Sequence, residues 1–281
     1  MLKTQQRYKS AQGIAYTRSG SAHNSSDPAI VLIHGVGLRA EAWFYQVEAL
    51  AKSHTVYAID MPGHGESDLL SDENAGLKEY VSAISQWVET EINAPVIIMG
   101  HSMGAMIALR FAIDYPKQCL GAVALNAVYQ RTQQAREAVQ QRAQYMLDNP
   151  EMDRVSTPIA RWFGDSPQGH DLEMAELCAS WLNAAPAQGY AKAYGIFSRN
   201  DGPLASELAA ITVPVAYVTG DGDSNSSPEM SVQMAELTPQ GTACVIDNSR
   251  HMVQITHAQA VNQQLVDFVS QLTSDNKNKG V

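Results

Sequence analysis

Short runs of aliphatic residues alternate along the chain with longer segments in which apolar side chains recur at helical spacing. The aliphatic runs show little polar alternation, which is typical of parallel strands buried on both faces of a sheet. This alternation of strands and helices predicts an α/β fold with a mostly parallel, doubly wound sheet. Strands are predicted at residues 29–34, 55–60, 95–100, 121–126, 213–219 and 242–246. Helices are predicted at about residues 41–52, 77–91, 103–114, 128–147, 228–237 and 257–272.

Two segments depart from this alternation. Residues 7–18 have the pattern of an antiparallel hairpin at the edge of the sheet. Residues 127–200 contain helical patterns and no convincing strand. We therefore predict a helical cap at 127–200, inserted into an α/β core that is formed by 1–126 and 201–281. The polar tail at 274–281 is expected to fray.

The bulk composition narrows the class of protein. With 45% hydrophobic and 17% charged residues, the chain is expected to be globular. A net charge of −10 argues against binding to nucleic acid, and no stretch approaches the roughly 18 apolar residues of a membrane span. The N-terminus lacks the apolar core of a signal peptide, and the three cysteines are scattered. A cytoplasmic protein with reduced thiols is therefore expected.

The segment Gly100-His101-Ser102-Met103-Gly104 has the G-x-S-x-G spacing of a nucleophile elbow. It follows a predicted strand and precedes a predicted helix. In this strand–turn–helix setting the motif indicates a nucleophilic serine. The sharp turn lifts the serine hydroxyl above the end of the strand, and the small residues let the backbone close. Ser102 is therefore the predicted nucleophile.

A serine nucleophile needs a base, and in this kind of fold the chain order is serine, acid, histidine. His251 follows the last predicted strand and is the predicted general base. Asp221 and Asp223 both follow the strand at 213–219, and the G-x-x-D spacing favours Asp223 as the acid that orients the imidazole. Asp221 would then stabilise the turn or face solvent. Other histidines are expected at the surface: His54, His170 and His257.

A glycine-rich loop, His34-Gly35-Val36-Gly37, is expected to bring backbone N–H groups close to the nucleophile. The N–H groups of Val36 and Met103 are the predicted oxyanion hole, and His34 is expected only to brace the loop. Asp60 and His64 lie in a second loop, but two isolated ligands are a weak metal signal, and the loop lacks the lysine of a phosphate-binding loop. We therefore expect neither a metal nor an organic cofactor.

Taken together, these motifs resemble the α/β-hydrolase superfamily over nearly the whole chain. They are the H-G-V-G loop, the D-x-x-G-x-G-x-S loop at 60–67, G-H-S-M-G, G-D-G-D at 220–223 and the late His251. Within the superfamily, sequences at 161–163, 189–191 and 201–214 resemble the serine hydrolase branch of 3-oxoadipate enol-lactonases and related small carboxylesterases. Ser102 separates the chain from haloalkane dehalogenases and epoxide hydrolases, which place aspartate at the nucleophile position.

We therefore expect a serine esterase or lactonase that acts on a small-molecule ester or lactone through an acyl-enzyme. Trp162 and Tyr190 lie in the predicted cap and are candidates to line the substrate pocket. One alternative is a C–C bond hydrolase of a vinylogous diketone that uses the same triad. Such ring-cleavage enzymes usually have an H-G-x-G-P-G loop, whereas Leu38 and Arg39 follow Gly37 here. A triad-retaining ligand receptor is the second alternative. Nothing in the sequence points to a particular oligomeric state.

Overall fold

A computed structural model describes residues 6–20, 27–149 and 152–278. An eight-stranded sheet runs through it in the order β1-β2-β4-β3-β5-β6-β7-β8. All neighbouring strands from β4 to β8 are parallel, and the β1–β2 hairpin is added antiparallel at one edge. The strands are β1 (Arg7–Lys9), β2 (Ala15–Ser19), β3 (Ile30–Ile33), β4 (Val56–Ile59), β5 (Val96–His101), β6 (Cys119–Leu125), β7 (Val215–Gly220) and β8 (Gly241–Ile246).

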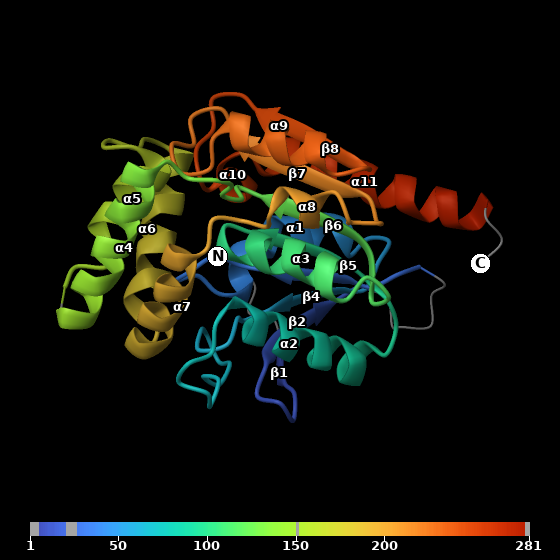
Figure 1. The fold of residues 1–281 in the computed structure, drawn as a ribbon, viewed down its shortest axis with the longest axis horizontal. Helices are drawn as coiled ribbons and strands as arrows, with labels where there is room; N and C mark the ends of the chain where they lie inside the picture. Colours follow the sequence, from blue (N-terminus) through green and yellow to red (C-terminus); the bar gives the residue numbers. More distant parts are fainter. Residues whose placement is uncertain (1–5, 21–26, 150–151, 279–281) are drawn as a thin grey trace.

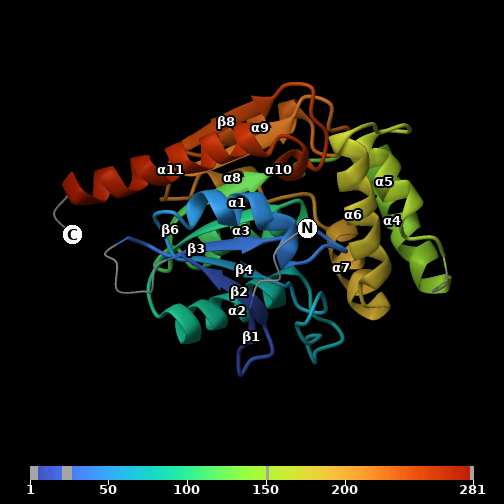
Figure 2. The same ribbon diagram turned by 180° about the vertical axis from the view of Figure 1, so that it is seen from behind.

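Helices cover both faces of the sheet, which confirms the predicted doubly wound α/β fold. Figure 1 shows α2 and α3 in front of the sheet, and Figure 2 shows α1 and α11 on the opposite face. No helix of the described residues is long and apolar enough to cross a membrane. The helices are η1 (Ala40–Trp43), α1 (Phe44–Leu50), α2 (Leu77–Trp87), the π-helix η2 (Val88–Ile92), α3 (Met103–Asp114), α4 (Gln133–Asp148), α5 (Ser156–Phe163), α6 (His170–Ala184), α7 (Ala187–Arg199), α8 (Ala205–Leu208), α9 (Pro228–Leu237), α10 (Val253–Thr256) and α11 (Ala258–Asn278).

The central strands send side chains into both helical layers. In β3, Val31 and Ile33 join the core cluster on the side of α2 and α3, whereas Ile30 and Leu32 join the cluster on the side of α1 and α11. All four side chains are fully buried, so β3 has no polar face. This explains why its sequence shows an aliphatic run without alternation.

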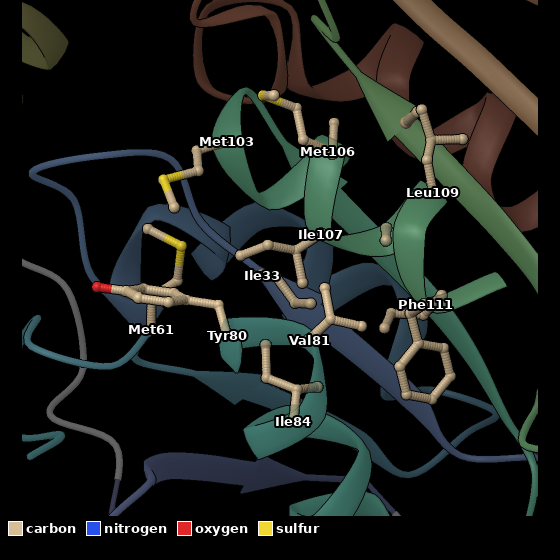
Figure 3. Packing of buried hydrophobic residues seen from close by; sticks show 14 of the residues in the cluster. Ile33, Met61, Tyr80, Val81, Ile84, Met103, Met106, Ile107, Leu109 and Phe111 are labelled. Atoms are coloured by element: carbon tan, nitrogen blue, oxygen red, sulfur yellow. The ribbon is translucent and has the colours of Figure 1, made fainter. Parts of the chain in front are cut away.

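Apolar side chains of α2 and α3 pack together over the sheet, as Figure 3 shows. Val81 and Ile84 of α2 lie in one cluster with Ile107 of α3 and Ile33 of β3. The two residues of α2 are three positions apart and therefore share one face of the helix. This packing fixes α3 on the sheet, and with it the turn that precedes α3.

Most predicted elements are present, and the differences have local causes. The helix expected from residue 128 begins at Gln133, because Gln130 has a left-handed φ of 47° and Thr132 caps the helix by accepting a hydrogen bond from the Ala135 N–H at 3.2 Å. The last helix extends to Asn278, beyond the point where fraying is expected from the sequence. His54 is not at the surface as expected, since only 7% of it is exposed.

Of the five helices that the structure describes between β6 and β7 in the chain, the first four, α4 to α7, are called the inserted helices below. They stack at one end of the sheet, opposite the end toward which α11 extends (Figures 1 and 2). Arg131 ties the start of this segment to its end. Its buried guanidinium donates to the Asp201 carboxylate and to the carbonyls of Phe197 and Asn200.

The inserted helices meet the loops of the sheet at backbone distance. A β-carbon on Gly189, in the first turn of α7, would lie 1.8 Å from the carbonyl oxygen of Gly63 in the loop after β4. A β-carbon on Gly37, in the loop after β3, would lie 2.5 Å from Leu182 and 2.7 Å from Tyr190. The absence of side chains at these positions therefore lets α6 and α7 rest directly on two sheet loops.

We expect Gly189→Ala to lower the free energy of unfolding by about 1–3 kcal/mol, because the new methyl group overlaps the Gly63 carbonyl and the two backbones must separate. Gly195→Ala is the matched control on the same helix, since its β-carbon would meet only the end of the Arg199 side chain, at 3.4 Å. It should leave stability unchanged or raise it by up to about 1 kcal/mol. Urea denaturation followed by circular dichroism measures both, and equal stability of the two variants would contradict the close contact.

Candidate active site

Ser102 lies on a sharp turn between β5 and α3. Its φ of 56° and ψ of −117° lie outside the regions that residues with side chains usually adopt. Two glycines permit the turn. A β-carbon on Gly100 would lie 1.9 Å from the Gly104 carbonyl oxygen, and one on Gly104 would lie 2.1 Å from the carbonyl oxygen of Ile33. The turn places Ser102 at the carboxyl end of β5, where it lines a cavity.

His251 lines the same cavity and is paired with Asp223. Nδ1 of His251 and Oδ2 of Asp223 are 2.7 Å apart, and both side chains are almost completely buried. An ionised carboxylate can only accept a hydrogen bond, so this pairing assigns the proton of the neutral imidazole to Nδ1. Nε2 is then the nitrogen that can accept a proton.

The Asp223 carboxylate is held by further donors. The Asn126 side-chain amide donates to Oδ2 at 2.8 Å, and the backbone N–H of Asn225 donates to Oδ1 at 2.9 Å. Burial by itself raises the pKa of this carboxyl group, but the His251 imidazole and these hydrogen bonds outweigh burial and hold the pKa below its usual value. Asp223 is therefore ionised at neutral pH although it is buried.

Asp221, the other carboxylate after β7, has a different environment. It is exposed, and its Oδ1 accepts a hydrogen bond from the backbone N–H of Ser249 at 3.0 Å. Backbone N–H groups of Asn248 and Ser249 lower the pKa of Asp221. Asp221 thus stabilises the turn that leads to His251, while Asp223 contacts the imidazole.

The loop after β3 lies against Ser102. A β-carbon on Gly35 would be 3.0 Å from the β-carbon of Ser102, and Val36 lines the same cavity as the serine. Met103 is the first residue of α3, where backbone N–H groups lack partners within the helix. The two residues predicted to donate N–H groups to an oxyanion therefore belong to the two segments that meet at Ser102.

His34 connects this loop to the loop after β4. Its Nε2 accepts a hydrogen bond from the Met61 N–H at 3.0 Å, and its Nδ1 lies 2.7 Å from the Gly35 carbonyl oxygen. Burial, together with the nearby His64, holds the pKa of His34 well below its usual value. His34 is therefore a neutral ring with both nitrogens engaged by the backbone, an arrangement suited to bracing the loop.

Two residues beside the Asp223–His251 pair, His101 and Asn126, are hard to recognise as part of a site from the sequence. Nε2 of His101 lies 2.8 Å from the His251 carbonyl oxygen, and the two rings are 4.9 Å apart. Burial, with a smaller contribution from His251, lowers the pKa of His101 to about 3, so this ring places no charge next to His251 at neutral pH.

Asn126 follows β6 with a left-handed φ of 51°. Its place as a polar residue at the carboxyl end of a predicted strand is the one sequence signal that could have identified it.

The cavity above Ser102 lies between the sheet loops and three inserted helices. Trp162 and Tyr190, the two candidate pocket residues, both line it. The Trp162 ring stacks on the His251 ring with centroids 6.0 Å apart. Sequence reasoning did not identify the other residues that the inserted helices contribute: Arg142, Pro158, Arg161, Tyr194 and Phe197.

Asp60 has partners other than His64. It forms an ion pair with Arg7 and accepts hydrogen bonds from the N–H groups of Ala40 at 2.8 Å and Glu66 at 2.9 Å. Asp60 thus ties the start of η1 and the loop after β4 to the edge strand β1. Across the part of the chain that the structure describes, no group of three or more histidine, cysteine, aspartate or glutamate side chains is placed to hold a metal ion.

Sequence comparisons identify relatives over most of the chain. The model of the alpha/beta hydrolase fold family matches residues 28–258. The (E)-2-((N-methylformamido)methylene)succinate hydrolase of Acinetobacter baylyi is 40% identical over 238 residues, which are 84% of this chain and 88% of that protein. The 3-oxoadipate enol-lactonase 1 of the same organism is 28% identical over 250 residues, 87% of this chain and 90% of that protein.

Solved structures show the same fold. An esterase from Thermogutta terrifontis superposes with a TM-score of 0.80 at 21% identity, covering 95% of this chain and 99% of the esterase. The enol-lactonase from Burkholderia xenovorans superposes with a TM-score of 0.78 at 21% identity, covering 92% of this chain and 96% of the enol-lactonase. At this level of identity the agreement concerns the fold alone.

The two carboxylates after β7 can be distinguished by proton NMR. The wild-type protein should show a strongly downfield signal from the His251 Nδ1 proton, because that proton is shared with an ionised, buried carboxylate. Asp223→Asn should abolish the signal, since an amide carries no charge and can turn its NH₂ group toward the ring. Asp221→Asn is the control and should retain it. Loss of the signal in Asp221→Asn, or its survival in Asp223→Asn, would reverse the pairing.

Proposed function

The chain belongs to the α/β-hydrolase fold family, and on this basis we propose that it hydrolyses a small carboxylic ester or lactone through a serine acyl-enzyme. Ser102 is the nucleophile, His251 the general base and Asp223 the acid that orients it. The observation that carries the proposal is the buried Asp223–His251 pair at 2.7 Å, on the same cavity as Ser102. The mechanism uses only side chains and backbone N–H groups of this chain.

In the acylation step, Ser102 Oγ attacks the carbonyl carbon while His251 Nε2 takes the hydroxyl proton. The carbonyl electron pair moves to oxygen, where the N–H groups of Val36 and Met103 stabilise the negative charge. The tetrahedral intermediate collapses, and its C–O bond to the leaving alcohol breaks. The imidazolium returns its proton to that alcohol, and Asp223 stabilises the cation while it exists.

In the deacylation step, water replaces the alcohol. His251 removes a proton from the water as its oxygen attacks the acyl carbon, and the same two N–H groups hold the second oxyanion. The bond to Ser102 Oγ then breaks, and the serine recovers a proton from His251. The products are a carboxylic acid and an alcohol, or a single hydroxy acid or its keto tautomer when the substrate is a lactone or an enol-lactone.

We further propose that residues 127–200 act as a cap that selects the substrate. The cap contributes Trp162 and Tyr190 to the cavity wall, and Trp162 stacks directly on the base. The chemistry resides in the loops at the carboxyl ends of the strands, as is usual for open α/β sheets. Substrate selection and bond cleavage would then be assigned to separate parts of the chain.

A second candidate is hydrolysis at a bond other than an ester C–O bond. The observation in its favour is the 40% identical relative, whose name describes a substrate with an N-methylformamido group, an acyl–nitrogen bond. The same attack by Ser102 would cleave such a bond, with nitrogen leaving in place of oxygen. Cleavage of a C–C bond in a vinylogous diketone is the other alternative. A panel of aryl esters, small lactones, N-acyl enamines and vinylogous diketones separates these reactions by their relative kcat/KM.

Ser102→Ala should remove nearly all hydrolysis, with kcat lower by a factor on the order of 10⁴ or more, because the nucleophile is lost while the rest of the site remains. The measurement is hydrolysis of an aryl ester by both proteins, with circular dichroism to show that the variant is folded. A fluorophosphonate should label the wild type at Ser102 and leave the variant unlabelled. Labelling at a different residue would refute this assignment.

A further inference from the structure

Two arginines line the cavity and have no part in the bond-breaking steps. Arg142 comes from α4, and Arg161 comes from the last turn of α5. No acidic side chain is among the residues that line this cavity, although the protein carries a net charge of −10. Positive charge is therefore concentrated next to Ser102 in a protein that is otherwise acidic.

These guanidinium groups lack counterions among the described residues. Five other arginines form ion pairs within 4 Å, but Arg142 and Arg161 have no carboxylate within that distance in the described part of the chain. Nη2 of Arg142 is buried without a hydrogen-bond partner there, an arrangement that is costly for a charged donor. Asp153 feels the charge of Arg142, but it is exposed and accepts hydrogen bonds from the N–H groups of Val155 and Ser156.

Arg154 adds a third positive charge close to the wall of this cavity. Its guanidinium carbon lies 5.5 Å from the centroid of the Tyr190 ring, and its Nη1 is also buried without a partner among the described residues. Burial raises the pKa of Tyr190 to about 12, and the charges of Arg142, Arg154 and Arg161 oppose that rise. All three arginines thus lie close enough to act on one side chain of the cavity wall.

We propose that Arg142 and Arg161 form a carboxylate-binding subsite, so that the substrate cleaved at Ser102 carries a carboxylate distant from its scissile carbonyl. This inference rests on the proposed function, because it assigns the substrate class of the same site. The guanidinium fork matches a carboxylate with two parallel hydrogen bonds, and such bonds are strongest where water is excluded. Interaction with the C-terminal end of α5 could account for Arg161, but not for Arg142, which lies in the interior of α4.

Two esters of the same acyl chain test the subsite: 4-nitrophenyl hydrogen adipate, with a free distal carboxylate, and 4-nitrophenyl methyl adipate, in which that charge is removed. Wild type should have the higher kcat/KM for the acid. Arg142→Gln and Arg161→Gln should each lower the ratio of acid to methyl ester by about 10- to 100-fold, the effect of losing a hydrogen bond to a charged group. Lysine at either position should recover part of the ratio, because it keeps the charge without the fork.

Arg136→Gln is the matched control on α4. Arg136 is paired with Asp201 and does not line the cavity, so the ratio should stay at the wild-type value. Hydrolysis of both esters by wild type with equal kcat/KM would overturn the subsite while leaving the hydrolase activity intact. An equal loss on both esters in the two glutamine variants would overturn it as well.

A binding measurement separates this proposal from the proposed function. Titration calorimetry with adipate and with monomethyl adipate needs no turnover, and adipate should bind wild type more tightly than its monomethyl ester. Each glutamine variant should weaken adipate binding by about 10- to 100-fold. If no ester is hydrolysed but adipate binds in this arginine-dependent way, the subsite stands and the proposed reaction fails. Inorganic phosphate binding as tightly as adipate would overturn the assignment to a carboxylate.

Discussion

The structure depends on a backbone crossing that leaves no room for a side chain. Where β5 turns into α3, the backbone of Gly100 lies against that of Gly104, and Gly104 lies against the carbonyl of Ile33 in β3. A strand end, a helix start and a neighbouring strand thereby meet in direct contact. The crossing holds Ser102 at a positive φ, a conformation that costs of order 1–3 kcal/mol and that persists because packing of α3 on the sheet determines it.

Burial and hydrogen bonds fix the charge of three groups around the candidate site: His34, His101 and Asp223. His34 and His101 are buried, engaged by backbone carbonyls and held neutral at neutral pH. Asp223, although buried, is held ionised by the groups that donate to it. His251 lies between these environments, with a fixed negative charge on one side and no competing positive ring on the other. The charges of these three groups are thus fixed before a substrate enters.

Much of this arrangement could be predicted from short, local signals. The aliphatic runs indicate strands because both faces of the sheet are covered, and G-x-S-x-G indicates a contact that needs glycine at both ends. The spacing G-x-x-D distinguishes Asp223 from Asp221, and the structure pairs Asp223 with the imidazole. What escaped prediction depends on contacts between distant segments. His101 matters because it meets the carbonyl of residue 251, and Arg142 and Arg161 matter because two helices place them over one cavity.

The tie that Arg131 makes with Asp201 has a consequence for how such a protein can diversify. The chain leaves β6 and returns toward β7 at one anchored point, where Gln130 also donates its N–H to the Asp201 carbonyl at 2.9 Å. Asn126 and Asp223 therefore both lie outside the stretch whose two ends are held together at this point. A new preference for a substrate could arise by recombination of a single contiguous piece of coding sequence, in one genetic event, with the residues proposed to cleave the bond lying outside the exchanged piece.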